Sequence, residues 1–115
     1  MYSEAYLEGI RLFNAQSFWH AHEAWEECWH EAEEPDATFY KGIIQAAAAL
    51  VHWQRGNLRG LHRNWAKSQD KLDTLPTTHL GLDLVAFRGV MDAFIAACDA
   101  GETGIVPSIT LSADA

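Results

Sequence analysis

The chain has 115 residues, of which 49% are hydrophobic and 21% are charged, so its size and composition predict one globular domain and exclude a disordered chain. Sixteen acidic residues against eight basic ones give a formal net charge of −8, which argues against binding to nucleic acid or an anionic membrane, because such binding needs Lys and Arg to neutralise phosphates. The sequence also lacks a signal-peptide pattern and an apolar stretch of about 18 residues, so we expect a cytoplasmic protein without a membrane span.

Two serine residues are expected to cap the first two helices. Ser3 precedes a helix that ends near Asn14, and its apolar stripe consists of Tyr6, Ile10 and Phe13. Ser17 precedes a second helix, which Glu34-Pro35 should end because proline cannot continue a helix. The core-facing stripe of this second helix consists of Phe18, Ala21, Trp25, Cys28, Trp29 and Ala32.

Asp36 is expected to cap a third helix over residues 37–55, which is apolar around most of its circumference and therefore predicted to be buried at the centre. The pair Gly56-Asn57 combines a helix-ending glycine with an N-cap, so a tight turn should fold the fourth helix back antiparallel to the third. The inner stripe of the fourth helix consists of Leu58, Leu61, Trp65 and Leu72.

A fifth helix is predicted over residues 83–100, with Gly101 as its end. Its inward residues are Phe87, Val90, Met91, Phe94 and Cys98. The predicted fold is all-α, a compact antiparallel bundle of about five helices in residues 1–101 with an extended C-terminal tail. The tail, residues 102–115, is either extended or disordered, and the residues that could lie across the bundle are Ile105, Val106, Ile109 and Leu111.

Polar side chains interrupt the apolar faces of the second and third helices. His22 and Glu26 lie about 40° apart at the edge of the apolar stripe, and Gln45 shares a stripe of the third helix with Lys41 and His52. Polar groups at such positions need partners. We therefore predict that Glu26 lies within hydrogen-bond or one-water reach of His22, and that Gln45 approaches the same cluster.

Several motifs of the chain occur in an order that resembles a known family. They are Phe13-Asn14, Phe18-x-x-Ala21-His22-Glu23-x-Trp25-Glu26-x-x-Trp29, Tyr40-x-Gly42-x-Ile44-Gln45-x-Ala47-Ala48 and Gly56-Asn57-x-x-Gly60. Over roughly residues 3 to 75 this pattern resembles the prokaryotic domain-of-unknown-function family 309, with Leu61 as a departure that touches packing only. The resemblance implies a helical bundle of a prokaryotic cytosolic protein and implies no activity.

Three interpretations of the polar cluster compete. In the first, His22, Glu26 and Gln45 form a structural hydrogen-bonded network. In the second, a small polar ligand binds there, and the candidate ligand-binding residues are His22, Glu23, Glu26, Gln45, Trp19, Trp25 and Trp29. In the third, a divalent metal binds to His22, Glu26 and His52, or to Glu23 in place of His52. The second histidine of a zinc-protease helix is missing, so no cofactor is evident.

The leading functional hypothesis is a non-catalytic or small-ligand-binding domain. The alternative is a metal-dependent hydrolase-like enzyme centred on His22, Glu23 and Glu26, so whether the protein is an enzyme stays open. A second alternative is a protein-interaction module, because a basic stripe at four-residue spacing on one helix could dock on the glutamate-rich second helix of another subunit in a homodimer. That basic stripe consists of Arg59, Arg63, Lys67 and Lys71. The remaining histidines are expected to face solvent and are His20, His30, His62 and His79.

Overall fold

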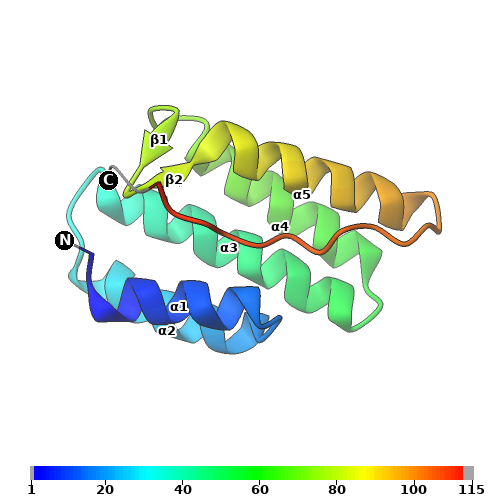
Figure 1. The fold of residues 1–115 in the computed structure, drawn as a ribbon, viewed down its shortest axis with the longest axis horizontal. Helices are drawn as coiled ribbons and strands as arrows, with labels where there is room; N and C mark the ends of the chain where they lie inside the picture. The colour runs from blue at the N-terminus through cyan, green and yellow to red at the C-terminus, as the bar shows by residue number, and fades with distance from the viewer. Residues whose placement is uncertain (1, 113–115) are drawn as a thin grey trace.

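The computed structural model describes residues 2–112, which form five α-helices and one short antiparallel β-hairpin (Figure 1). In chain order the elements are α1 (Glu4–Asn14), α2 (Phe18–Glu31), α3 (Asp36–Gln54), α4 (Leu58–Leu72), β1 (Thr78–His79), β2 (Leu82–Asp83) and α5 (Leu84–Asp99). In Figure 1, α3 lies between the pair formed by α1 and α2 and the pair formed by α4 and α5. The predicted all-α bundle of about five helices is therefore confirmed. No helix within residues 2–112 is long and apolar enough to cross a membrane.

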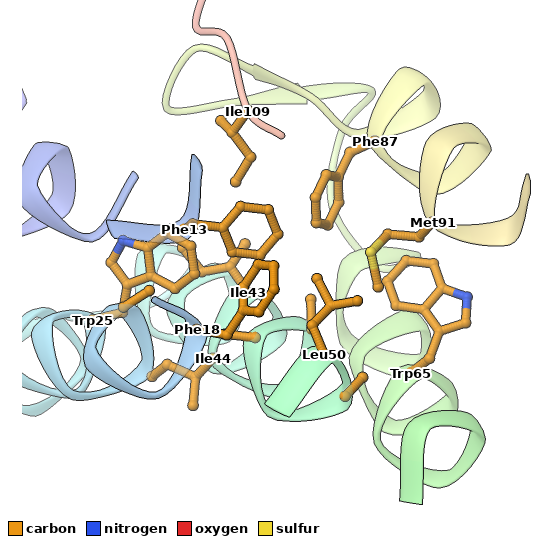
Figure 2. Close-up of a cluster of buried hydrophobic side chains, with 14 of the residues drawn as sticks. Phe13, Phe18, Trp25, Ile43, Ile44, Leu50, Trp65, Phe87, Met91 and Ile109 are labelled. Carbon is orange, nitrogen blue, oxygen red and sulfur yellow. The ribbon is translucent and has the colours of Figure 1, made fainter. Parts of the chain in front are cut away.

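Aromatic and branched side chains from all five helices and from the tail fill one core (Figure 2). The Phe13 ring of α1 lies with its centre 5.0 Å from that of Phe18 in α2 and 6.1 Å from that of Phe87 in α5. Leu50 of α3 is fully buried in the same cluster. The central helix predicted from the apolar circumference of residues 37–55 is α3, because neighbours on several sides remove its side chains from water.

Local capping signals placed three helix ends correctly. The Ser3 hydroxyl accepts a hydrogen bond from the backbone N–H of Tyr6 at the start of α1. The Asn57 side chain does the same for Gly60 at the start of α4, directly after Gly56 with a φ of 71°. Gly101, with a φ of 70°, follows α5. These signals succeed because a cap and the amide that it satisfies lie within one turn of each other.

The predicted boundary between α2 and α3 is wrong in its details. The Ser17 hydroxyl makes no capping hydrogen bond, since its backbone (φ −90°, ψ 62°) lies outside the usual N-cap conformation. The second helix ends at Glu31, before the residue that proline restricts. At the start of α3, Glu34 rather than Asp36 provides the cap, because its Oε1 accepts from the N–H and the hydroxyl of Thr38 at 2.9 and 2.6 Å.

Other predicted environments also need correction. Leu58 and Val90 were assigned to inner stripes but are 42% and 43% exposed, because helical phase gives a direction and does not ensure that another element covers it. His79 was expected in solvent, yet its side chain is only 11% exposed and its Nε2 lies 2.8 Å from Oδ1 of Asp36. The β-hairpin brings it there, and strands of two residues are too short to produce an alternating pattern.

The described part of the C-terminal tail follows α5 back along the bundle toward the β-hairpin (Figure 1). The Asn14 side chain holds it with two hydrogen bonds, donating to the carbonyl of Ile109 at 2.8 Å and accepting from its N–H at 2.7 Å. Ile109 is 3% exposed and belongs to the core, whereas Ile105 is 89% exposed. The expectation for residues 113–115 lies outside the described residues.

Candidate functional site

One polar stripe of α3 reaches the surface. Of residues 39 to 52, only the four at this stripe are partly exposed, and they are Lys41, Gln45, Ala48 and His52. Their spacing of four, three and four residues puts them in one row along the helix. We call this row the α3 stripe, and the seam that it shares with α2 is the candidate site.

Two contacts fix the register of α2 against α3. Near one end, Nζ of Lys41 lies 4.7 Å from the centre of the Trp29 ring. Near the other end, Nε2 of Gln54 donates to the carbonyl of Gln16 over 2.8 Å. Counting four residues forward from Lys41 and four back from Trp29 places Gln45 opposite position 25 of α2.

His22 and Glu26 flank that position on α2. Nε2 of His22 lies 3.5 Å from Oε1 of Glu26, and the two side chains are 22% and 30% exposed. The imidazole also stacks on the Trp19 ring, with centres 5.1 Å apart and an angle of 11° between the planes. Trp19 is itself 49% exposed, so it forms an outer wall of the seam.

Two buried polar atoms of this seam have no hydrogen-bond partner among the described residues. They are Nδ1 of His22 and Oε1 of Gln45, and the third such atom in residues 2–112 is the hydroxyl of Tyr2. Burying a donor or acceptor without a partner costs about 1–3 kcal/mol. The two atoms therefore favour a group that forms hydrogen bonds with both, donating to Oε1 of Gln45 and either donating to or accepting from Nδ1 of His22, whose role depends on the tautomer.

The other predicted site residues lie elsewhere. Glu23 is exposed. Trp25 turns into the core, where its Nε1 donates to the carbonyl of Tyr6 over 3.1 Å. Nδ1 of His52 lies 3.1 Å from Nδ2 of Asn57, at the turn into α4. Within the described chain, no group of three or more His, Cys, Asp or Glu side chains is placed to hold a metal ion. The candidate set of His22, Glu26 and His52 is therefore not assembled as a metal site in this structure.

A hollow that the sequence did not predict adjoins the seam at its Trp29 end. It has a volume of about 180 Å³ and is lined by Trp29, Glu34, Ala37, Thr38, Lys41 and Lys71. Lys71 comes from α4 and was counted in the exposed basic stripe, yet it is partly buried here. The only sequence signal was Gly42, which permits close approach of a neighbouring helix.

Cys28 of α2 is partly buried and lies apart from the seam. It lines a separate hollow of about 300 Å³ with Ser3, Ala5, Glu27, Glu31, Ala32, Asp36 and Tyr40. Burial raises the pKa of the Cys28 thiol, so the reactive thiolate is disfavoured near neutral pH. Burial likewise raises the pKa of the Tyr40 hydroxyl, to about 12.

Comparison with known proteins places the seam inside a recognised segment. Residues 6–64 match the model of a family described as "Domain of unknown function (DUF309)". The chain is also similar to the "Uncharacterized protein YpuF" of Bacillus subtilis (strain 168), with 36% identity over 70 residues. That alignment covers 59% of this chain and 40% of the relative, so the chain matches less than half of the relative's length.

Proposed function

The chain belongs to the DUF309 family, and we propose that it binds a small polar ligand in the seam between α2 and α3. Gln45 and His22 provide buried polar atoms without partners inside the seam, and Glu26 adds a carboxylate beside His22. Trp19 and Trp29 provide aromatic walls on the outside. Pockets for small molecules commonly combine apolar walls with a few convergent polar groups.

The observation that carries the proposal is the pair of buried atoms without partners. A structural network would satisfy its own hydrogen bonds, because a partly satisfied network is less favourable than apolar packing. A binding site keeps groups that lower the stability of the free protein and that gain their partners only from the ligand. The unpartnered Nδ1 of His22 and Oε1 of Gln45 fit the second case.

Replacing Gln45 with methionine tests this interpretation through stability. The variant keeps the length of the side chain and removes the unpartnered acceptor, so the free energy of unfolding should stay equal or rise by up to about 2 kcal/mol. Urea denaturation measures the change. A loss of more than about 1 kcal/mol would show that the side chain belongs to a structural network and would contradict the ligand site.

Gln54→Met is the matched control, since it changes the same residue type on the same helix. The Gln54 side chain has a partner, the carbonyl of Gln16, so its loss should cost about 0.5–1.5 kcal/mol. Titration with acetamide, a small amide that can both donate and accept hydrogen bonds, should shift the side-chain amide resonances of Gln45 to saturation. Near-stoichiometric transition metal that is lost in His22→Ala would instead favour the hydrolase-like alternative centred on His22, Glu23 and Glu26.

A second candidate function, an interaction module that pairs with a second copy, is favoured by one apolar surface. Val90 and Ile105 are 43% and 89% exposed on α5 and the tail. Next to Ile105 lies a hollow of about 260 Å³, lined by Val90, Ala93, Phe94, Ile105, Val106, Pro107 and Ser108. A protruding side chain beside a hollow suits a two-fold interface, in which each copy fills the hollow of the other.

Sedimentation velocity distinguishes the two possible homodimers. Pairing through the apolar surface should persist at high salt and be abolished by Ile105→Asp, whereas Leu7→Asp, a change at a 45% exposed residue of α1, should leave it intact. Docking of the basic stripe of α4 on the glutamate-rich α2 should instead weaken with salt, since exposed charges are screened within about 10 Å at 0.1 M. A monomer at every salt concentration would contradict both homodimer models.

We also propose that the protein is cytoplasmic and does not bind nucleic acid. Both cysteines, Cys28 and Cys98, are free thiols, which suits a reducing compartment. The net charge of −8 disfavours association with phosphate backbones.

A further inference from the structure

We infer that the ligand of the seam carries an oxyanion, either a carboxylate or a phosphate group, and that Lys41 and Lys71 bind it in the hollow beside Trp29. This inference rests on the proposed function and adds the chemistry of the ligand. The hollow has a volume of about 180 Å³, which suffices for one such group.

Gly42 brings Lys71 to the hollow. A Cβ atom at position 42 would lie 2.9 Å from Cγ of Leu72 and 3.6 Å from Cβ of Lys71, so only glycine lets α4 approach α3 this closely. The Ser68 hydroxyl donates to the carbonyl of Gly42 over 2.7 Å and holds the two helices together. Packing of the two backbones therefore fixes the side of α4 from which Lys71 extends.

Lys41 comes from the α3 stripe and lies over the Trp29 ring, with Nζ 4.7 Å from the ring centre. Contact with the negative face of the indole positions the ammonium group without neutralising its charge. The side chain is partly buried among residues of α3 that are otherwise removed from solvent. Lys41 is therefore held at the junction between the hollow and the polar seam.

Neither ammonium group has a carboxylate partner. Among residues 2–112, neither Lys41 nor Lys71 forms an ion pair, and Lys71 reaches only the carbonyl of Lys67, at 3.5 Å. Arg11 and Arg88, in contrast, are paired with Glu8 and Asp73. Two unpaired cations in one hollow repel each other, and an anion between them would remove this cost.

Glu34 also lines the hollow, and its hydrogen bonds join it to Thr38 rather than to either lysine. Its Oε1 accepts from both the N–H and the hydroxyl of Thr38, and these bonds lower the pKa of the Glu34 carboxyl group. Glu34 is thus ionised near neutral pH and tied to the start of α3. The hollow keeps a net charge of about +1 from two lysines and one carboxylate, which favours an anion.

The hollow lies next to the seam that holds the unpartnered atoms of Gln45 and His22, because Lys41 and Trp29 line the hollow and also belong to the seam. Lys41 lies one helical turn from Gln45 along α3, and Trp29 lies about one turn from Glu26 along α2. One turn corresponds to a rise of about 5.4 Å. A molecule with an oxyanion at one end and an N–H donor at the other could therefore contact both groups of side chains.

The test is a titration of the ¹⁵N-labelled protein with sodium phosphate and, separately, with sodium acetate, at an ionic strength held constant with sodium chloride. We expect saturable shifts of the Trp29 indole N–H and of the amides of Lys41 and Lys71, with a dissociation constant in the millimolar range. The anion that binds more tightly identifies the oxyanion as phosphate or carboxylate. Lys41→Gln and Lys71→Gln should each weaken binding at least about fivefold.

Arg59→Gln is the matched control, because it removes one positive charge from an exposed position of the same helix as Lys71. It should leave the affinity within about twofold, since an exposed and distant charge is screened. Urea denaturation of all three variants verifies that they remain folded. Shifts that rise linearly with either anion, or an equal loss in Arg59→Gln, would overturn the oxyanion site. The Gln45→Met result is independent of this titration, so failure of the two proposals can be told apart.

Discussion

Replacing Trp25 with alanine is expected to lower the free energy of unfolding by about 3 to 5 kcal/mol, as measured by urea denaturation. Trp25 is fully buried, and its ring lies 5.7 Å from that of Phe13 across the contact between α1 and α2 (Figure 2). Its Nε1 donates to the carbonyl of Tyr6. The substitution removes a large apolar volume and the hydrogen bond from Nε1 to the Tyr6 carbonyl, so both effects act in the same direction.

Trp19→Ala is the matched control, because Trp19 belongs to the same helix and is 49% exposed. It should cost less than about 1 kcal/mol, as surface substitutions usually do. The core-facing stripe predicted for the second helix included both Trp25 and Trp29, which would make the two substitutions equally damaging. Trp29 is only partly buried, at the edge of the hollow beside Lys41, so we now expect a smaller loss. A loss under about 1 kcal/mol in the free energy of unfolding of Trp25→Ala would mean that α2 turns a different face toward the core.

Much of the fold could be predicted because its signals are local. The apolar stripes of α1 and α3 follow helical periodicity, and the Gly56-Asn57 turn combines an end signal with a start signal in adjacent residues. His79 could not be placed in this way, because its partner Asp36 lies 43 positions earlier in the chain. Leu58 and Val90 show a different limit, since phase cannot tell whether a neighbouring element covers a helix face.

The candidate site could be predicted from the sequence only in part. His22 and Glu26 could be paired from the sequence because four residues on one helix fix their separation. Lys71 could not be assigned to the site, since its place depends on the close packing of α4 on α3 at Gly42. The four-residue spacing does not distinguish Lys71 from Arg59, which belongs to the same periodic stripe. Tertiary packing alone makes one of them part of a hollow.

Replacing Gly9 with alanine is expected to destabilise the protein by about 3 kcal/mol, at the upper end of the cost of overpacking. Gly9 is buried in α1, and a Cβ atom there would overlap the Trp25 ring, reaching 2.6 Å from its Cε2 and even closer to its Nε1. The ring cannot easily move, because Phe13 and the carbonyl of Tyr6 hold it. The clash should exceed the gain of about 1 kcal/mol that alanine brings to a helix interior.

Gly89→Ala separates the clash from the helix propensity. Gly89 lies in the interior of α5, and a Cβ atom there meets nothing within 4 Å. This substitution should therefore stabilise the protein by about 0.5–1 kcal/mol, opposite in sign to Gly9→Ala. In a Trp25→Ala background the clash at position 9 disappears, so Gly9→Ala should become neutral or stabilising, and the double-mutant cycle measures the coupling. Additive effects of the two changes would show that α1 and α2 do not meet at Gly9 and Trp25.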